Sequence, residues 1–413
     1  MFDERTTEQR DLRGGRTPWL VGLQRLRRQR LDTNLRCEVL VVGAGITGSV
    51  VAEHLTRLGH EVVVVDRERP GHGSTAASTA MLLWEIDRSL GDLARIYGFD
   101  RAASIYRRSL EAARGMIALA ASLALPCGFA RHDALYLASA ETGEAELREE
   151  YALRMRAELP GRFLDHATLC ENYGVSRAAA LLSPMTAEAD PLRLAQALMQ
   201  LAIGRGARLF DAEAVSYDCA GRSVGVQLDD GHCIEAKHVV LATGYVMPDV
   251  LRSGLHSITS SFAIATPPHR EESLWRDRVL IWEASENYLY ARTTPGGRVI
   301  AGGEDDRQVI EPEARDAIMP AKAEAILRRL SALWPRTTPV AEFVWSGAFG
   351  TTADGLPLIG RVPGHPGIHA AYGYGGNGIT FSYLAAQMIG ELVAGRSRPW
   401  FDDFAVDRDP PSR

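Results

Sequence analysis

The feature that most constrains the fold of this chain is a glycine motif between two short apolar runs. The first run leads into Gly43-x-Gly45-x-x-Gly48, and the second ends at Asp66. This order predicts a strand, a tight turn, a helix and a second strand, which form the first half of a βαβ unit. Gly43 allows the turn, Gly45 lets the backbone approach a pyrophosphate, and Gly48 lets the helix pack closely on the strand.

The residues that follow the two strands indicate what this unit binds. Amide groups at the predicted helix start, at Ile46 and Thr47, favour a phosphate. Asp66 stands where a carboxylate can accept hydrogen bonds from both hydroxyls of an adenosine ribose. The motif therefore predicts a bound dinucleotide, and it does not separate FAD from NAD.

Length and composition limit the alternatives. A chain of 413 residues with 46% hydrophobic residues fits two closely joined domains. The formal charge of −6 argues against a nucleic-acid surface and leaves a small molecule as the expected partner. Five cysteines without Cys-x-x-Cys spacing predict reduced thiols and no metal site, and no apolar run has the length of a membrane helix. We therefore expect a cytoplasmic protein without a transmembrane segment; its oligomeric state stays open.

The arginine-rich segment 1–36 precedes the first strand and lacks the apolar core of a secretory signal. We expect it to be an arm that is flexible or docked on the surface. An alternative is a basic helix over 19–31.

Further along, small residues and glycines recur where strands end or helices begin. The small-residue segment 71–81 suits a loop that threads beneath a cofactor. A strand is predicted to end at Ala242-Thr243-Gly244, and Gly375-Gly376-Asn377-Gly378-Ile379-Thr380 opens a helix, which leaves its amides free. Two such helix starts suggest one long ligand held at both ends. Outside this unit we predict helices over 101–125, 144–158 and roughly 319–334, a hairpin at 229–231, and strands at 258–266, 278–283, 287–293 and 298–302.

Taken in order, these motifs resemble the FAD-dependent D-amino-acid oxidase family, which includes glycine oxidase, sarcosine oxidase and gamma-glutamylputrescine oxidase. Trp345-x-Gly347 followed by Asp354-Gly355-Leu356-Pro357-Leu358-Ile359-Gly360 completes the set. The resemblance covers about 37–395. It implies an α/β fold in which a Rossmann-like FAD-binding domain is interleaved with an antiparallel-sheet α+β substrate domain. The implied division is an arm at 1–36, FAD-binding segments 37–90, 187–258 and 344–400, substrate segments 91–186 and 259–343, and a tail at 401–413.

The resemblance also implies which residues contact FAD. At the second helix start, the helix dipole would stabilise negative charge on the pyrimidine side of the reduced ring. The implied contacts are Gly43, Gly45, Ile46, Thr47, Gly48, Asp66, Arg67, Ser74, Thr75, Ala76, Val215, Ala242, Thr243, Gly244, Gly376, Asn377, Gly378, Ile379 and Thr380.

Two departures from the family pattern are informative. Members that act on amino acids often carry Trp-x-Gly-x-Arg-Pro, whose Arg binds the substrate carboxylate, and here Phe349 and Gly350 stand in the Arg-Pro places. Members with histidyl-linked flavin carry His where this chain has Ala77, so we expect non-covalent FAD. The electron acceptor, O2 or another, stays open.

Candidate substrate residues are aromatic and acidic. Trp84, Glu85 and Asp87 follow the small-residue loop, and Glu85 or Asp87 could attract a cationic amine. Tyr288 and Tyr290 point to one face of a predicted strand, and Phe349 replaces the arginine. We predict oxidation of the C–N bond of an amine or amino acid by hydride transfer to flavin N5, which gives an imine that hydrolyses. Two alternatives are oxidation of a hydroxyl substrate, such as a hydroxy acid or glycerol phosphate, and a flavoprotein module that modifies RNA.

Overall fold

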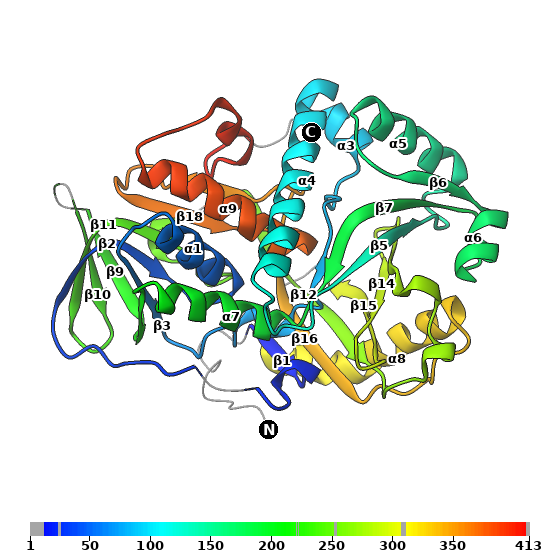
Figure 1. The fold of residues 1–413 in the computed structure, drawn as a ribbon, viewed down its shortest axis with the longest axis horizontal. Helices are drawn as coiled ribbons and strands as arrows, with labels where there is room; N and C mark the ends of the chain where they lie inside the picture. Colours follow the sequence, from blue (N-terminus) through cyan, green and yellow to red (C-terminus); the bar gives the residue numbers. More distant parts are fainter. Residues whose placement is uncertain are drawn as a thin grey trace.

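The strands of this protein form two mixed sheets, one of eight strands and one of ten, which lie side by side (Figure 1). This arrangement confirms the predicted α/β class with a second, mainly antiparallel sheet. The computed structural model describes residues 12–23, 26–219, 221, 223–251, 254–306 and 311–409.

The eight-stranded sheet is centred on β2 (Leu35–Val42) and β3 (Val62–Asp66), which pair in parallel as the glycine motif predicts. Its order is β17-β18-β11-β2-β3-β8, and all these neighbours are parallel except β17 and β18. Both faces of the central strands are buried, which explains their continuous apolar runs. The other strands are β8 (Arg208–Asp211), β9 (Ala214–Asp218), β10 (Val224–Leu228), β11 (Cys233–Leu241), β17 (Leu358–Arg361) and β18 (Ile368–Tyr372).

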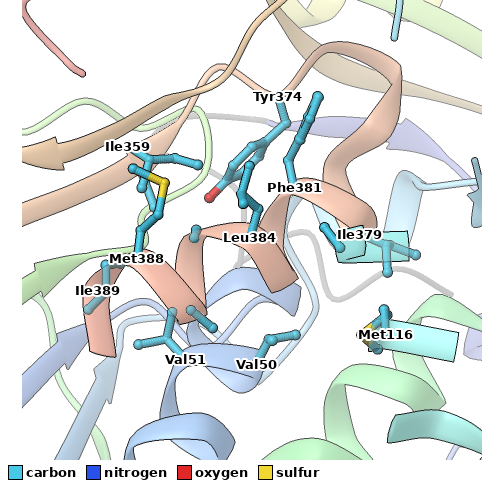
Figure 2. Close-up of a cluster of buried hydrophobic side chains, with 14 of the residues drawn as sticks. Val50, Val51, Met116, Ile359, Tyr374, Ile379, Phe381, Leu384, Met388 and Ile389 are labelled. Carbon is cyan, nitrogen blue, oxygen red and sulfur yellow. The ribbon is translucent and has the colours of Figure 1, made fainter. Parts of the chain in front are cut away.

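Three helices cover one face of this sheet: α1 (Ile46–Arg57), α7 (Pro191–Gly204) and α9 (Gly378–Val393) (Figure 1). Figure 2 shows the apolar side chains of α9 lying between Val50 and Val51 of α1 and Ile359 of β17. The starts of α1 and α9 are joined directly, because the hydroxyls of Thr47 and Ser382 lie 2.9 Å apart. This packing brings the two predicted glycine-rich helix starts together.

The ten-stranded sheet has the order β1-β16-β12-β15-β14-β13-β5-β7-β4, with β6 paired to β7. Its neighbours are antiparallel except β13 and β5. Helix α8 (Pro312–Leu333) buries an apolar face against it. The strands are β1 (Arg13–Gly15), β4 (Met81–Leu82), β5 (Ala130–Leu137), β6 (Arg162–Asp165), β7 (Ala179–Glu188), β12 (His256–Ala265), β13 (Leu280–Glu283), β14 (Leu289–Thr293), β15 (Val299–Asp306) and β16 (Phe343–Thr352).

The three helices predicted over 101–125, 144–158 and 319–334 are confirmed except at their ends, as α4 (Phe99–Ser122), α5 (Glu144–Arg156) and α8. α8 begins seven residues earlier than predicted, because Pro320 lies inside the helix and does not start it. No helix of the described residues combines the length and apolar character needed to cross a membrane. The remaining bounds are α2 (Ser74–Ala77), α3 (Leu90–Tyr97) and α6 (His166–Tyr173).

The strand β16 (Phe343–Thr352) lies in a different sheet from the one expected for its segment. β16 falls in the segment expected to belong to the cofactor domain, yet it pairs along its whole length with β12 in the ten-stranded sheet. Sequence spacing could not show this pairing, because the partner strand lies about eighty residues earlier in the chain. The division into domains stays a prediction.

The N-terminal arm docks on the protein as a strand and not as a helix. β1 pairs with β16, and the helical structure in the described part of 19–31 is limited to the end of one 3-10 turn, Pro18–Leu20, while Gln29 forms a β-bridge with Phe210. The alternative of a basic helix is therefore wrong for these described residues, while 24–25 lie outside them. The Trp19 indole nitrogen donates to Ser78 O at 3.0 Å, which ties the arm to the small-residue loop.

Candidate active site

A cavity of about 1040 Å³ runs from the carboxyl ends of β2, β3 and β11 across to the ten-stranded sheet. Val42, Asp66 and Ala242 line it where these three strands end, and Phe262 and Tyr290 line it from β12 and β14. Ligands of open α/β sheets bind at this edge of the strands. The cavity is therefore the candidate cofactor and substrate site.

The three glycines of the motif are required by close backbone contacts. A Cβ on Gly43, whose φ is +106°, would lie 2.3 Å from Ala242 O, and a Cβ on Gly48 would lie 1.8 Å from Gly43 O. A Cβ on Gly45 would meet only the Thr75 hydroxyl, at 3.1 Å. Gly43 and Gly45 line the cavity, whereas Gly48 is buried in the packing of helix on strand.

Asp66 holds the glycine turn and the loop after β3 together. Its Oδ2 accepts a hydrogen bond from Ala44 N at 2.6 Å, and its Oδ1 accepts one from Glu68 N at 2.8 Å. Burial of the carboxyl group raises its pKa to about 6, although both amide bonds act in the opposite direction.

The small-residue loop packs against the start of α1. Ile46 N donates to the Thr75 hydroxyl at 2.9 Å, and the Ser74 hydroxyl is enclosed without a hydrogen-bond partner. Ala77 lines the cavity, whereas Ala76 is fully buried and does not line it. Most residues of the loop line the cavity, among them Gly73, Ser74, Thr75, Ser78, Thr79 and Ala80.

The other predicted nucleotide contacts surround the same end of the cavity. Arg67 pairs with Glu213 at 3.2 Å, and Val215 is 55% exposed at the wall. The Tyr217 hydroxyl, which the sequence reasoning missed, is enclosed there without a partner. Also lining the cavity are Ile46, Thr47, Ala242, Thr243 and Gly244.

At the other end, the start of α9 is bound to the segment 83–87. Asn377 donates from Nδ2 to Glu85 O, and Thr380 donates to Leu83 O at 2.6 Å. Thr380 does not line the cavity, while Gly376, Asn377, Gly378 and Ile379 do line it. The Asn377 and Thr380 side chains are hydrogen-bonded within the protein. Backbone groups are therefore what this helix start can offer to a ligand.

The substrate end is built from aromatic rings and acids. Tyr288 and Tyr290 stack with ring centroids 6.0 Å apart, and Tyr136 and Trp282 stack at 4.0 Å. The Tyr288 hydroxyl donates to Asp305 Oδ2 at 2.7 Å. All five side chains line the cavity, and of the four aromatic ones the sequence predicts only Tyr288 and Tyr290.

Three predicted substrate residues are placed differently. Trp84 is fully buried, donates to Pro184 O and does not line the cavity, so its prediction is wrong. Glu85 lies at the wall, but its enclosed carboxylate faces Arg154, whose Nη1 is 3.6 Å away. Phe349 pairs with Thr259 through its backbone in β16, and its side chain lies outside the described part of the chain.

Of the cavity residues that the sequence does not predict, only some could have been recognised from their position in the chain. Tyr245 follows Ala242-Thr243-Gly244 directly and lines the cavity, where burial raises its pKa to about 12. A residue next to a predicted cofactor strand could have been included on that ground. Tyr136 and Trp282 lie on β5 and β13, whose parallel pairing joins segments far apart in the chain.

Comparison with known proteins defines the class. Residues 38–392 match the FAD dependent oxidoreductase family, and the chain belongs to this family. Gamma-glutamylputrescine oxidoreductase of Escherichia coli (strain K12) is 25% identical over 388 residues, covering 91% of this chain and 87% of the relative. Glycine oxidase of Geobacillus kaustophilus (strain HTA426) is 26% identical over 379 residues, covering 87% and 93%.

Solved structures show the same fold. The crystal structure of glycine oxidase from Geobacillus kaustophilus has a TM-score of 0.75 at 21% identity, covering 91% of this chain and all of that one. That of L-proline dehydrogenase from P. horikoshii has a TM-score of 0.73 at 18% identity, covering 91% and 98%.

The nucleotide end fits the FAD that this family uses. The Ser74 hydroxyl has no partner, Gly45 leaves space beside the start of α1, and Asp66 presents a carboxylate at the end of β3. These are donors and acceptors for a phosphate and a ribose.

Proposed function

We propose that this chain oxidises the C–N bond of an amine with FAD, giving an imine that hydrolyses. The observation that carries the proposal is the charge of the substrate end. Asp87 and Asp305 line the cavity there, whereas the one cationic side chain among its described lining residues is Arg67 at the nucleotide end. An acidic, aromatic site attracts an ammonium ion and disfavours a carboxylate.

The aromatic rings support the same substrate class. Tyr288, Tyr290, Tyr136 and Trp282 offer ring faces on which an ammonium ion gains about 0.5–2 kcal/mol. The carboxylate of an amino acid would have no arginine fork among the described lining residues, and a buried anion without a partner costs binding energy. The names of the relatives include both an amine substrate and amino acids. Of these two substrate classes, the charge pattern of the cavity favours the amine.

Bound FAD supplies a two-electron acceptor for the C–H bond beside the substrate nitrogen. The residues of the chain hold the reacting carbon in place and exclude water. We propose that FAD is bound without a covalent link, since Ala77 stands at the place where histidyl-linked members carry His.

The test is anaerobic bleaching of the flavin absorbance, which does not depend on the electron acceptor. Putrescine, N-methylputrescine and N-methylbenzylamine should reduce the flavin faster than glycine, sarcosine or D-alanine. Reduction by lactate or glycerol 3-phosphate, and not by amines, would replace the proposal with oxidation of a hydroxyl substrate. An absence of reduction together with tight, salt-sensitive RNA binding would favour the RNA-modifying alternative.

The substitution Phe349→Arg separates the two substrate classes further. It restores the arginine that amino-acid-oxidising members of the family carry at this place. We expect it to shift preference toward sarcosine and D-alanine by roughly ten- to a hundredfold relative to the amines, which corresponds to about 1.5–3 kcal/mol for a charge-assisted contact. If the wild type already oxidises a small amino acid efficiently and the substitution abolishes this activity, the carboxylate binds elsewhere.

A further inference from the structure

Asp87 occupies the point where the cavity meets the start of α9. Gly376 N donates to its Oδ2 at 2.8 Å, and its side chain is exposed to the cavity. A Cβ on Gly375 would lie 2.0 Å from Asp87 Oδ2, and one on Gly376 would lie 2.9 Å from its Oδ1. The two glycines therefore make room for this carboxylate, and the amide bond fixes its direction.

The segment that carries Asp87 is held firmly. Leu83 O and Glu85 O accept hydrogen bonds from the side chains of Thr380 and Asn377, so three bonds join 83–87 to the start of α9. Asp87 is thus fixed beside the end of the cavity that the family resemblance assigns to the flavin ring.

The other groups that could take a proton at this end are unsuitable. No histidine or lysine is present among the described residues that line the cavity. Burial raises the pKa of Tyr288 well above that of a free tyrosine, and it raises the pKa of Tyr245 to about 12. The tyrosines are therefore protonated at neutral pH and cannot accept a proton.

The other carboxylates are engaged or enclosed. Glu85 has a fully enclosed carboxylate, and Glu283 is held by Arg177 at 2.9 Å and Arg329 at 2.7 Å. Asp305 accepts the Tyr288 hydroxyl through Oδ2, and its Oδ1 is enclosed by protein. Asp87 has no ion-pair partner among the described residues, and it remains as the accessible acceptor.

The groups that face Asp87 bring the pKa of its carboxyl group close to neutral pH. Burial by the cavity walls raises its pKa to about 6, the Gly376 amide lowers it, Asp305 raises it further and Arg88 lowers it. Tyr245 and Tyr288 also face it and are neutral in this range. Above pH 6 the group is an anion able to accept a proton, which suits a general base.

We propose that Asp87 is the catalytic residue that accepts the proton of the substrate ammonium. In this step an N–H bond breaks, its electron pair stays on nitrogen, and an O–H bond forms on Asp87. The lone pair can then form the C=N bond as the neighbouring C–H bond breaks and its hydrogen leaves as hydride, for which bound FAD would supply the two-electron acceptor. Asp87 later returns the proton to solvent. This role rests on the proposed oxidation of an amine.

The test compares the wild type with Asp87→Asn, which keeps an oxygen for the Gly376 amide but cannot accept the proton. The rate of anaerobic flavin reduction by N-methylbenzylamine is measured by stopped flow from pH 5.5 to 10. The wild-type rate should rise through about pH 6. The Asp87→Asn variant should be about a hundredfold slower at pH 7.5, and its rate should keep rising with pH as free amine becomes available. In a second variant, Asp87→Ala, added formate should partly restore the rate.

Two controls make the outcome specific. Asp306→Asn removes a carboxylate that pairs with Lys322 at 3.6 Å and does not line the cavity, and it should leave the profile unchanged. FAD affinity and the visible spectrum of Asp87→Asn should match the wild type. A wild-type pH profile in Asp87→Asn overturns the role of Asp87 alone, whereas failure of every amine to reduce the wild-type flavin overturns the proposed function.

Discussion

Replacing Asp66 with Asn should separate cofactor binding from folding stability. Burial raises the pKa of this carboxyl group from 3.8 to about 6 in the protein without ligand. A rise of about two pKa units means that the charged form costs the apoprotein roughly 3 kcal/mol at neutral pH. Below pH 3.8 the carboxyl group is protonated in the folded and the unfolded protein, so the folded protein keeps this full contribution to its stability. As the pH rises through 6, the group ionises in the folded protein and this contribution is lost.

The Asn side chain removes that cost but loses one good contact. Asp66 accepts amides on both oxygens, from Ala44 and Glu68, so the amide group of Asn must point its donor at one of them, which costs about 1–3 kcal/mol. The two effects nearly cancel, and the melting temperature of the apoprotein at pH 8 should change little. FAD affinity should fall roughly ten- to a hundredfold, because a charged acceptor of ribose hydroxyls is lost.

The assay is a titration of each apoprotein with FAD, followed by quenching of the flavin fluorescence, together with thermal unfolding of the apoproteins. Asp402→Asn, which changes an exposed acid, is the matched control and should bind FAD like the wild type. If Asp66→Asn binds FAD within about threefold of the wild type, the ribose is not held at the end of β3 and the reasoning fails.

Three further substitutions test other parts of the structure. Arg408→Ala should destabilise the FAD-bound protein by about 3–5 kcal/mol in thermal unfolding, because it leaves Asp354 buried without its two-bond partner, and a loss below 1 kcal/mol would contradict this. Trp19→Phe removes the bond to Ser78 O and should weaken FAD binding about fivefold, whereas unchanged binding would mean that the arm does not support the loop. Gly302→Ala places a Cβ 2.1 Å from the Tyr290 hydroxyl, so it should raise the KM for an amine several-fold with FAD affinity unchanged; an unchanged KM would remove Tyr290 from the substrate site.

The cofactor half of the site could be predicted from sequence because local backbone geometry determines it. Gly43, Gly45 and Gly48 lie in one turn and helix start, and Asp66 ends the adjacent strand. The substrate half depends on contacts between distant segments. Asp87 meets Gly376 across 289 positions, and no spacing rule predicts such a contact.

The same reason explains the errors in the predicted site. The sequence predicts Trp84, Glu85 and Asp87 in the pocket because they follow the cofactor loop, but segment 83–87 uses its carbonyl groups to bind α9. That leaves Trp84 in the core and the Glu85 carboxylate beside Arg154, while the Asp87 side chain is exposed to the cavity. Neighbouring residues in an extended segment point in different directions, so position in the sequence did not decide which of them faces the cavity.

The central claim is that the site selects an amine over the corresponding amino acid. It is tested most directly with N-methylphenethylamine and the two enantiomers of N-methylphenylalanine, which differ from it only by a carboxylate. The measurement is the second-order rate constant of anaerobic flavin reduction at pH 8. The charge of the cavity predicts a constant at least about tenfold larger for the amine, which corresponds to about 1.4 kcal/mol. A larger constant for either amino acid would contradict the account.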